Sequence, residues 1–184
     1  MKKIRAIFLD RDGVINRYPG DTKYVTAWKD FRFLPGAKQA IAKLYAAGFK
    51  LFIVSNQAGV GKGVYSRKKL DLITRNMLRQ IREAKGRIER VYCCVHRPED
   101  NCACRKPKAG AIHLIAEKYP LDLKKSFFIG DTIRDVKTAH AAGCSSILLL
   151  CGKEKLSRRK LWEANPDFIF RNLYEATQLI LRKK

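Results

Sequence analysis

The chain has 184 residues, 46% of them hydrophobic and 30% charged, which suits one globular domain and excludes collagen-like, low-complexity and wholly disordered proteins. Its apolar runs fall far short of the roughly 20 residues that a membrane span needs, and its first residues form no signal-peptide core, so we expect a cytoplasmic protein without membrane contact. A formal net charge of +22 suggests a polyanionic partner, although surface charges often only keep a protein in solution.

Short apolar segments alternate with helical patterns along the whole chain. In chain order, we expect a strand at 4–9, a helix that begins after Pro35 and Gly36 and ends at Gly48, a strand at 50–54, a helix at 66–84, a strand at 91–95, a helix at 109–119, a strand at 126–129, a helix that ends at 142, a strand at 145–150, a candidate sixth strand at 167–170 and a closing helix at 173–181. Such alternation predicts an α/β fold of the Rossmann-like three-layer type, in which helices cover both faces of a parallel sheet.

Three segments lack a clear period. Residues 16–33 predict an ordered insertion or a flap, and residues 55–63, which contain three glycines, predict a loop. The charged stretch 152–160 predicts an exposed connection. We find no internal repeat and no flexible linker, so residues 1–184 are expected to form a single domain.

Polar side chains follow four of the expected strands. They are Asp10 and Asp12, Ser55 and Asn56, Cys94 and His96, and Gly130 and Asp131. In parallel sheets, ligands bind where the carboxyl ends of the strands meet, so these residues are expected at one edge of the sheet. Three carboxylates there would repel one another, which favours Mg²⁺ and an anionic substrate, although Asp-Gly is also an ordinary turn signal.

Four short motifs occur in a fixed order. The chain reads FLDRDGVIN at 8–16, VSNQ at 54–57, RKP at 105–107 and IGDT at 129–132, with Asp135 shortly after. This pattern strongly resembles the haloacid dehalogenase-like (HAD) phosphohydrolase superfamily over residues 4–150. The resemblance implies a HAD-like phosphatase that hydrolyses phosphomonoesters with Mg²⁺ through an aspartyl-phosphate intermediate.

The resemblance also implies roles for the motif residues. Asp10 corresponds to the nucleophile, and Asp12 to the general acid that protonates the leaving alcohol and then acts as the base. The Ser55 hydroxyl and the Asn56 backbone amide would hold phosphoryl oxygens, and Lys106 would neutralise the transferring group.

The same correspondence implies the magnesium ligands. They would be Asp10, Asp131 and the backbone carbonyl of Asp12, with Asp135 as a weaker candidate.

Three thiols and one imidazole lie within eleven positions. Cys94, His96, Cys102 and Cys104 form a Cys₃His set, which is a closed ligand set for structural Zn²⁺. Strand alternation points Cys93 to the opposite face, and Cys144 and Cys151 are expected to be core thiols. A zinc ion there would fix Arg105 and Lys106 at the edge of the sheet.

Within the superfamily, this cysteine loop resembles the branch of D-glycero-D-manno-heptose 1,7-bisphosphate phosphatases and histidinol-phosphate phosphatases, which largely lack a separate cap domain. We favour removal of the C7 phosphate of the heptose bisphosphate, a step of lipopolysaccharide precursor synthesis. A bisphosphate needs a second anion site, for which Arg105, Lys62 and Arg67 are candidates. Histidinol phosphate would instead need an acidic partner for its amine, such as Asp21 or Asp30.

A further alternative rests on the basic charge. Residues 62–90 hold ten Lys or Arg and three acidic residues, so a polynucleotide 3′-phosphatase or a basic nucleic-acid-binding protein stays open. Tyr65 is the one aromatic residue among these cations, which favours a solvated helix face over a surface that stacks bases. We therefore expect a monomer that acts on a small phosphorylated substrate.

Overall fold

Six parallel strands form one sheet in the order β3-β2-β1-β4-β5-β6 in the computed structural model, which describes residues 3–182. The strands are β1 (Ala6–Leu9), β2 (Lys50–Asn56), β3 (Arg90–Cys94), β4 (Phe127–Gly130), β5 (Ser145–Leu149) and β6 (Phe168–Phe170). β2 and β3 lie on one side of β1, whereas β4, β5 and β6 lie on the other, so the strand order reverses between β1 and β4. In open α/β sheets, ligands bind at such a switch point. The predicted α/β class and the sixth strand are confirmed.

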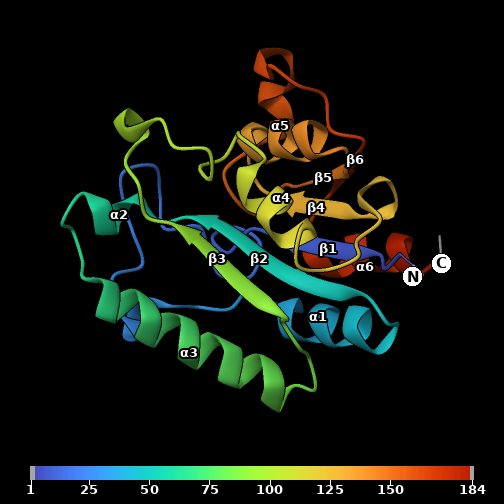
Figure 1. Cartoon of the computed structure of the whole chain (residues 1–184), viewed down its shortest axis with the longest axis horizontal. Helices are drawn as coiled ribbons and strands as arrows, with labels where there is room; N and C mark the ends of the chain where they lie inside the picture. The colour runs from blue at the N-terminus through green and yellow to red at the C-terminus, as the bar shows by residue number, and fades with distance from the viewer. Residues whose placement is uncertain (1–2, 183–184) are drawn as a thin grey trace.

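Helices cover both faces of this sheet (Figure 1). α1 (Ala37–Ala46), α3 (Arg67–Glu83) and α6 (Leu173–Arg182) pack on one face, and α4 (Gly110–Ala116) and α5 (Ile133–Ala142) pack on the other. β1 serves both sides, because Ile7 and Leu9 join the first core and Ala6 and Phe8 join the second. The fold therefore has the predicted three layers.

α3 shows how the sequence sets a helix. Ser66 caps its start, since the Ser66 hydroxyl accepts a hydrogen bond from the backbone N–H of Lys69 at 3.3 Å. Leu70, Ile73 and Met77 follow at helical spacing and are buried, whereas the opposite face of the helix is basic and exposed.

Several expected boundaries shift. Ile4 makes only an isolated bridge to Leu121, so the first strand begins two residues later than predicted. The fourth helix ends at Ala116, three residues before the expected end, where the chain approaches Pro120.

The predicted loop at 55–63 is wrong in two respects. Ser55 and Asn56 still belong to β2, and the short helix α2 (Ala58–Gly61) follows. A Cβ on Gly59 would lie 2.5 Å from the Tyr65 ring, so this glycine permits close packing and does not loosen the chain.

The connections between these elements are ordered turns. Residues 16–33 are an ordered insertion, since Val25 and Phe31 are buried in the core and Asn16 bridges to Phe33. The insertion contains the turn η1 (Trp28–Asp30), and η2 (Pro98–Asp100), η3 (Leu123–Lys125) and η4 (Leu156–Leu161) lie in other connections. η4 is exposed, as predicted for 152–160. Between residues 3 and 182, no helix has the length and apolar character that crossing a membrane requires.

Candidate active site

The carboxyl ends of β1, β2 and β4 open into one cleft of about 610 Å³. It is lined by all seven residues that were predicted to act on the phosphate or its metal ion: Asp10, Asp12, Ser55, Asn56, Arg105, Lys106 and Asp131. Because neighbouring parallel strands end at the same edge, residues far apart in the sequence meet there.

A buried cluster of carboxylates forms the floor of the cleft. One carboxylate oxygen from each of Asp10, Asp131 and Asp135 lies within 4.8 Å of the others. The Lys106 ammonium, whose side chain is 2% exposed, lies 2.8 Å from Asp10 Oδ2 and 2.6 Å from Asp135 Oδ1. The cluster thus holds three carboxylates and one ammonium.

This imbalance favours a further cation. Burial raises the pKa of Asp10, and although Lys106 opposes this, the carboxylates of Asp135 and Asp12 add to it. Burial and then the charges of Asp135 and Asp10 raise the pKa of Asp131 well above its usual range. Mg²⁺ prefers carboxylate oxygens and would relieve the repulsion, so the donor set fits this ion.

Asp135 belongs to the cluster more closely than the sequence predicted. The Thr132 hydroxyl accepts a hydrogen bond from the Asp135 backbone N–H at 3.3 Å, and Asp135 Oδ2 accepts from the Thr132 backbone N–H at 3.1 Å. This reciprocal cap starts α5 and leaves Asp135 Oδ1 facing Lys106. The side chain of Asp12, in contrast, is not part of the carboxylate cluster.

Asp12 is held by its own polar network. Arg11 Nη2 lies 2.9 Å from Asp12 Oδ2, Asn16 Nδ2 donates to Oδ1 at 2.8 Å, and Gln57 Nε2 donates to Oδ2 at 2.9 Å. Burial acts to raise the pKa of Asp12, but the Arg11 charge and these hydrogen bonds outweigh it and lower the pKa. Tyr65 completes the network by donating to Gln57 Oε1 at 2.6 Å.

Sequence reasoning assigned no role to Arg11, Asn16, Gln57 or Tyr65. Arg11 is 1% exposed, and an arginine is rarely so buried unless it is paired. The available signal was that Arg11, Asn16 and Gln57 lie within or at the end of the motifs at 8–16 and 54–57, but the contact of Gln57 with Asp12 joins residues 45 positions apart.

Two glycines hold Asp131 in a narrow slot. A Cβ on Gly13 would lie 2.0 Å from Asp131 Oδ2, and a Cβ on Gly152 would lie 2.1 Å from the same oxygen. The backbone N–H of Lys153 donates to Asp131 Oδ2 at 2.8 Å. Gly152 and Lys153, which we expected only in an exposed connection, therefore position this carboxylate.

Asn56 fixes the backbone of Lys106. Asn56 Nδ2 donates to the Lys106 carbonyl at 3.1 Å, and the Lys106 backbone N–H donates to Asn56 Oδ1 at 3.2 Å. Ser55, which is 2% exposed, accepts a hydrogen bond from Gln57 Nε2 at 3.0 Å. The Asn56 side chain thus positions Lys106, which the sequence did not predict. Among the described residues, the Asn56 backbone N–H makes no hydrogen bond outside the sheet.

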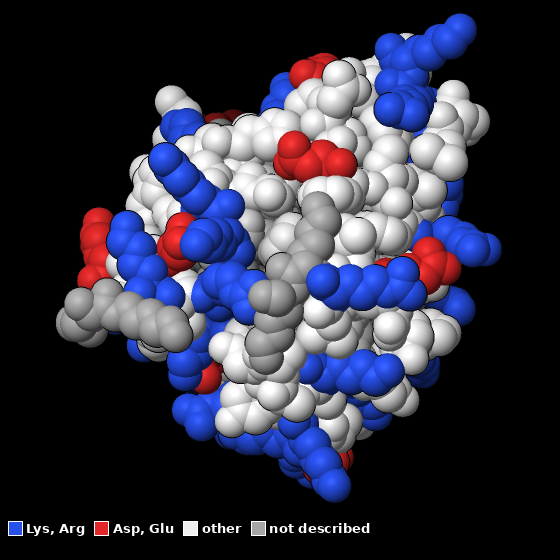
Figure 2. Space-filling view, turned by 90° about the vertical axis from the view of Figure 1, so that its right-hand side faces the viewer, with Lys and Arg blue, Asp and Glu red and all other residues white. Residues whose placement is uncertain are grey.

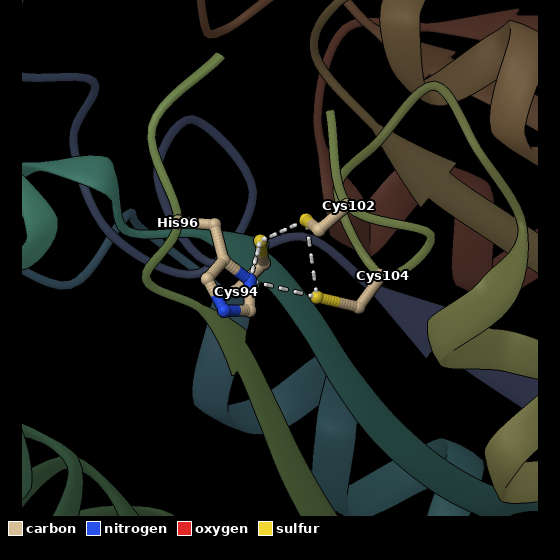
Figure 3. A group of neighbouring side chains, drawn as sticks. All are labelled: Cys94, His96, Cys102 and Cys104. Carbon is tan, nitrogen blue, oxygen red and sulfur yellow. Dashed lines mark hydrogen bonds between the residues drawn. The ribbon is translucent and has the colours of Figure 1, made fainter. Parts of the chain in front are cut away.

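The four predicted zinc ligands meet beside the cleft (Figure 3). The sulfurs of Cys94 and Cys102 are 3.6 Å apart, those of Cys102 and Cys104 are 3.5 Å apart, and His96 Nδ1 lies 3.3 Å from Cys104 Sγ. Ligand bonds of about 2.0–2.3 Å in a tetrahedron imply ligand separations of roughly 3.3–3.8 Å, so the set fits a zinc ion.

The remaining thiols lie apart from this set. Cys93 is outside the cluster, as predicted, and burial raises its pKa to about 11 even though the Arg11 guanidinium lowers it. Cys144 is buried in the core, and Cys151 is half-buried, with its thiol donating to the Gly13 carbonyl at 3.3 Å.

Only some of the candidates for a second anion site lie in the cleft. Arg105 and Lys62 line the cleft, but Arg67 lies outside it and pairs with Asp71 at 3.0 Å on the surface of α3, so that candidate was wrong. Of the two acidic candidates for an amine, Asp21 lines the cleft and Asp30 does not.

A parallel sheet with this carboxylate and lysine cluster at its switch point defines the class of HAD-like phosphatases. The HAD-hydrolase-like family model matches residues 103–176. A solved structure of D,D-heptose 1,7-bisphosphate phosphatase from B. bronchiseptica, complexed with magnesium and phosphate, superposes with a TM-score of 0.89 at 32% identity, covering 98% of this chain and 100% of that one.

Curated relatives agree with this class. The chain is 35% identical to a D-glycero-beta-D-manno-heptose-1,7-bisphosphate 7-phosphatase of Pseudomonas aeruginosa over 80% of this chain and 82% of the relative. It is 35% identical to a D-glycero-alpha-D-manno-heptose-1,7-bisphosphate 7-phosphatase of Campylobacter jejuni over 83% and 86%. The chain therefore belongs to the HAD-like phosphatase family that contains these enzymes.

Proposed function

We propose that this enzyme removes the C7 phosphate of D-glycero-D-manno-heptose 1,7-bisphosphate. One observation carries the proposal: the cleft has a carboxylate and lysine cluster on its floor and a surplus of cations on its walls. Such a cleft suits a small substrate with one phosphate to cleave and a second one to bind. The relatives that match most of the chain are named for this bisphosphate.

In the proposed mechanism, the Asp10 carboxylate attacks phosphorus, an aspartyl-phosphate forms, and the bond to the C7 oxygen breaks. Asp12 gives its proton to the departing oxygen, and then takes a proton from the water that attacks the aspartyl-phosphate and regenerates Asp10. Its lowered pKa suits the second step, and an arriving phosphate dianion, by adding negative charge nearby, favours the protonated form that the first step needs.

The other site residues would stabilise charge. The Ser55 hydroxyl, the Asn56 backbone N–H and the Lys106 ammonium would bind phosphoryl oxygens, and Arg105 would join Lys106 in binding substrate. Asp10, Asp131 and the backbone carbonyl of Asp12 would hold Mg²⁺, with Asp135 beside them. When bound, the ion supplies positive charge against the phosphoryl oxygens.

We further propose that Cys94, His96, Cys102 and Cys104 bind a structural zinc ion. Four protein ligands fill a tetrahedral site, so no position is left for a substrate. The ion would therefore act on catalysis only by holding the loop that carries Lys106.

Two rival functions are left as outcomes of the test. For histidinol phosphate, Asp21 is the acidic candidate in the cleft, but it already accepts a hydrogen bond from Tyr18 and pairs with Lys153. For a nucleic acid, the Lys and Arg side chains on the face shown in Figure 2 are separated by uncharged surface, so this one face carries no continuous basic groove. One domain over 1–184, a monomeric state and a cytoplasmic location stay predictions.

The test is Mg²⁺-dependent phosphate release from the two anomers of the heptose bisphosphate, from histidinol phosphate and from an oligonucleotide 3′-phosphate. We expect the highest kcat/KM for one heptose bisphosphate anomer, with the C1 phosphate retained in the product. A higher kcat/KM for either rival would overturn the substrate but keep the phosphatase site.

A further inference from the structure

The cleft extends well beyond the space that one phosphoryl group needs. On the side away from the zinc-ligand loop, its wall is formed by the first turn of α5 and by the segment between β5 and β6. We refer to residues 152–163 of that segment as the arm, since it stands out from the body of the molecule (Figure 1). The arm contributes Lys153, Arg158 and Trp162 to the cleft, and α5 contributes Arg134 and Lys137.

Two of the four cations on this wall are already engaged. Lys137 pairs with Glu163, and Lys153 pairs with Asp21. Arg134 and Arg158 differ, because both side chains are exposed and neither has an acidic partner among residues 3–182. Their guanidinium groups retain their full capacity to donate hydrogen bonds to a ligand.

Both arginines act on the same opposing loop. Tyr18 and Asp21 are joined by a hydrogen bond of 2.7 Å and line the same cleft, where Asp21 pairs with Lys153 of the arm. Burial raises the pKa of Tyr18, whereas the Arg134 charge acts to lower it. Hydrogen bonds from Lys153 and Tyr18 lower the pKa of Asp21, and the Arg158 charge contributes in the same direction. Arg134 of α5 and Arg158 of the arm thus line the same cleft from two different elements, and their charges act on the two members of the hydrogen-bonded Tyr18–Asp21 pair.

We infer that Arg134 and Arg158 bind the phosphate that is retained, and so select a bisphosphate over a monophosphate. This inference rests on the proposed function. Two arginine forks present planar pairs of N–H donors that match phosphate oxygens, which the unpaired lysines of the cleft, Lys23 and Lys62, do not offer. Arg134 lies next to Asp135 in sequence, so the retained phosphate would be fixed relative to the reacting one by the same turn of α5.

The test compares kcat/KM for the heptose 1,7-bisphosphate with kcat/KM for the heptose 7-phosphate, whose cleaved end is the same. Each of R134Q and R158Q should lower the ratio of these two values by about tenfold, and the double variant by about a hundredfold, as expected for the loss of one and two charge-assisted contacts. A general weakening of the fold would lower both values together and leave the ratio unchanged.

The matched control is R159Q. Arg159 is exposed on the same arm and does not line the cleft, so the variant makes the same charge change and should keep the wild-type ratio. A similar fall of the ratio in R159Q would indicate long-range electrostatic steering and would overturn the inference. An unchanged ratio in the double variant would also overturn it. Wild-type enzyme that prefers another phosphomonoester would instead refute the proposed function, and the inference with it.

Discussion

Replacing Lys106 by Met tests whether one ammonium balances the carboxylate cluster. Lys106 is buried and contacts Asp10 at 2.8 Å and Asp135 at 2.6 Å, and Met keeps the length of the stem without the charge. Removing one partner of a buried ion pair costs about 3–5 kcal/mol, because the remaining charge is buried without compensation. For a chain of this size each kcal/mol lowers the melting temperature by roughly 2–4 °C, so we expect a fall of about 6–20 °C.

The loss should depend on pH and on the partner. Without Lys106 the pKa values of Asp10 and Asp131 rise further, so the folded state takes up protons as the pH is lowered from neutral, and the loss of stability becomes smaller. Adding Asp135→Asn removes one of the repelling charges, so part of the stability should return and the double-mutant cycle should show coupling above about 1 kcal/mol.

The measurement is urea or thermal unfolding in a chelator, so that Mg²⁺ does not replace the missing charge. Lys118→Met is the matched control, since Lys118 is exposed on the chain after α4 and has no acidic partner in the described part of the chain; its cost should stay within about 0.5 kcal/mol. A cost for Lys106→Met below about 1 kcal/mol, or one independent of pH, would refute the reasoning. With Mg²⁺ present, turnover should fall by about 10²–10³-fold.

Three further outcomes are expected. Asp10→Asn should abolish phosphate release while the fold and the bound zinc are kept; residual wild-type activity would remove Asp10 as the nucleophile. Cys102→Ser or Cys104→Ser should lose zinc in elemental analysis and melt at a lower temperature, and an unchanged metal content would refute the zinc site. Gly152→Ala should raise the Mg²⁺ concentration needed for half-maximal activity by at least about tenfold, because its Cβ would lie 2.1 Å from Asp131 Oδ2; an unchanged requirement would show that the slot relaxes.

The sequence predicts elements well where short-range rules decide them. The apolar run at 6–9 between charged residues forms β1, and Ser66 begins α3 as its position before a periodic segment indicated. Alternation along β3 correctly separated Cys93 from Cys94. The glycine-rich segment after β2 was misread, because glycine serves both loops and close packing and only the neighbours of Gly59 distinguish the two.

The candidate site likewise has a part that the sequence predicts and a part that it does not. Strand ends placed Asp10, Ser55 and Asp131 together, since the carboxyl ends of parallel strands share one edge of the sheet. The contacts that orient these groups were not predictable, because they join residues distant in the sequence: Asn56 holds Lys106 across 50 positions, and Lys153 holds Asp131 across 22. Composition gives no indication of such pairs.

The loop at 95–105, which carries three of the four proposed zinc ligands, and Lys106 are linked through adjacent strands. Asn56 of β2 and Cys94 of β3 are partners in the sheet register, so the Asn56 side chain that holds Lys106 and the first zinc ligand lie side by side. Cys104 precedes Lys106 by two residues, and the loop is thus attached to the sheet once through the Cys₃His set and once through Asn56. With a zinc ion at the first attachment, the Lys106 backbone would have little freedom to move. Its ammonium would then stay between Asp10 and Asp135, whose charges offset the cost of burying it. Loss of the ion would leave the second attachment alone to hold this geometry, so a metal that never meets the substrate would still govern how well Lys106 neutralises the transferring phosphate.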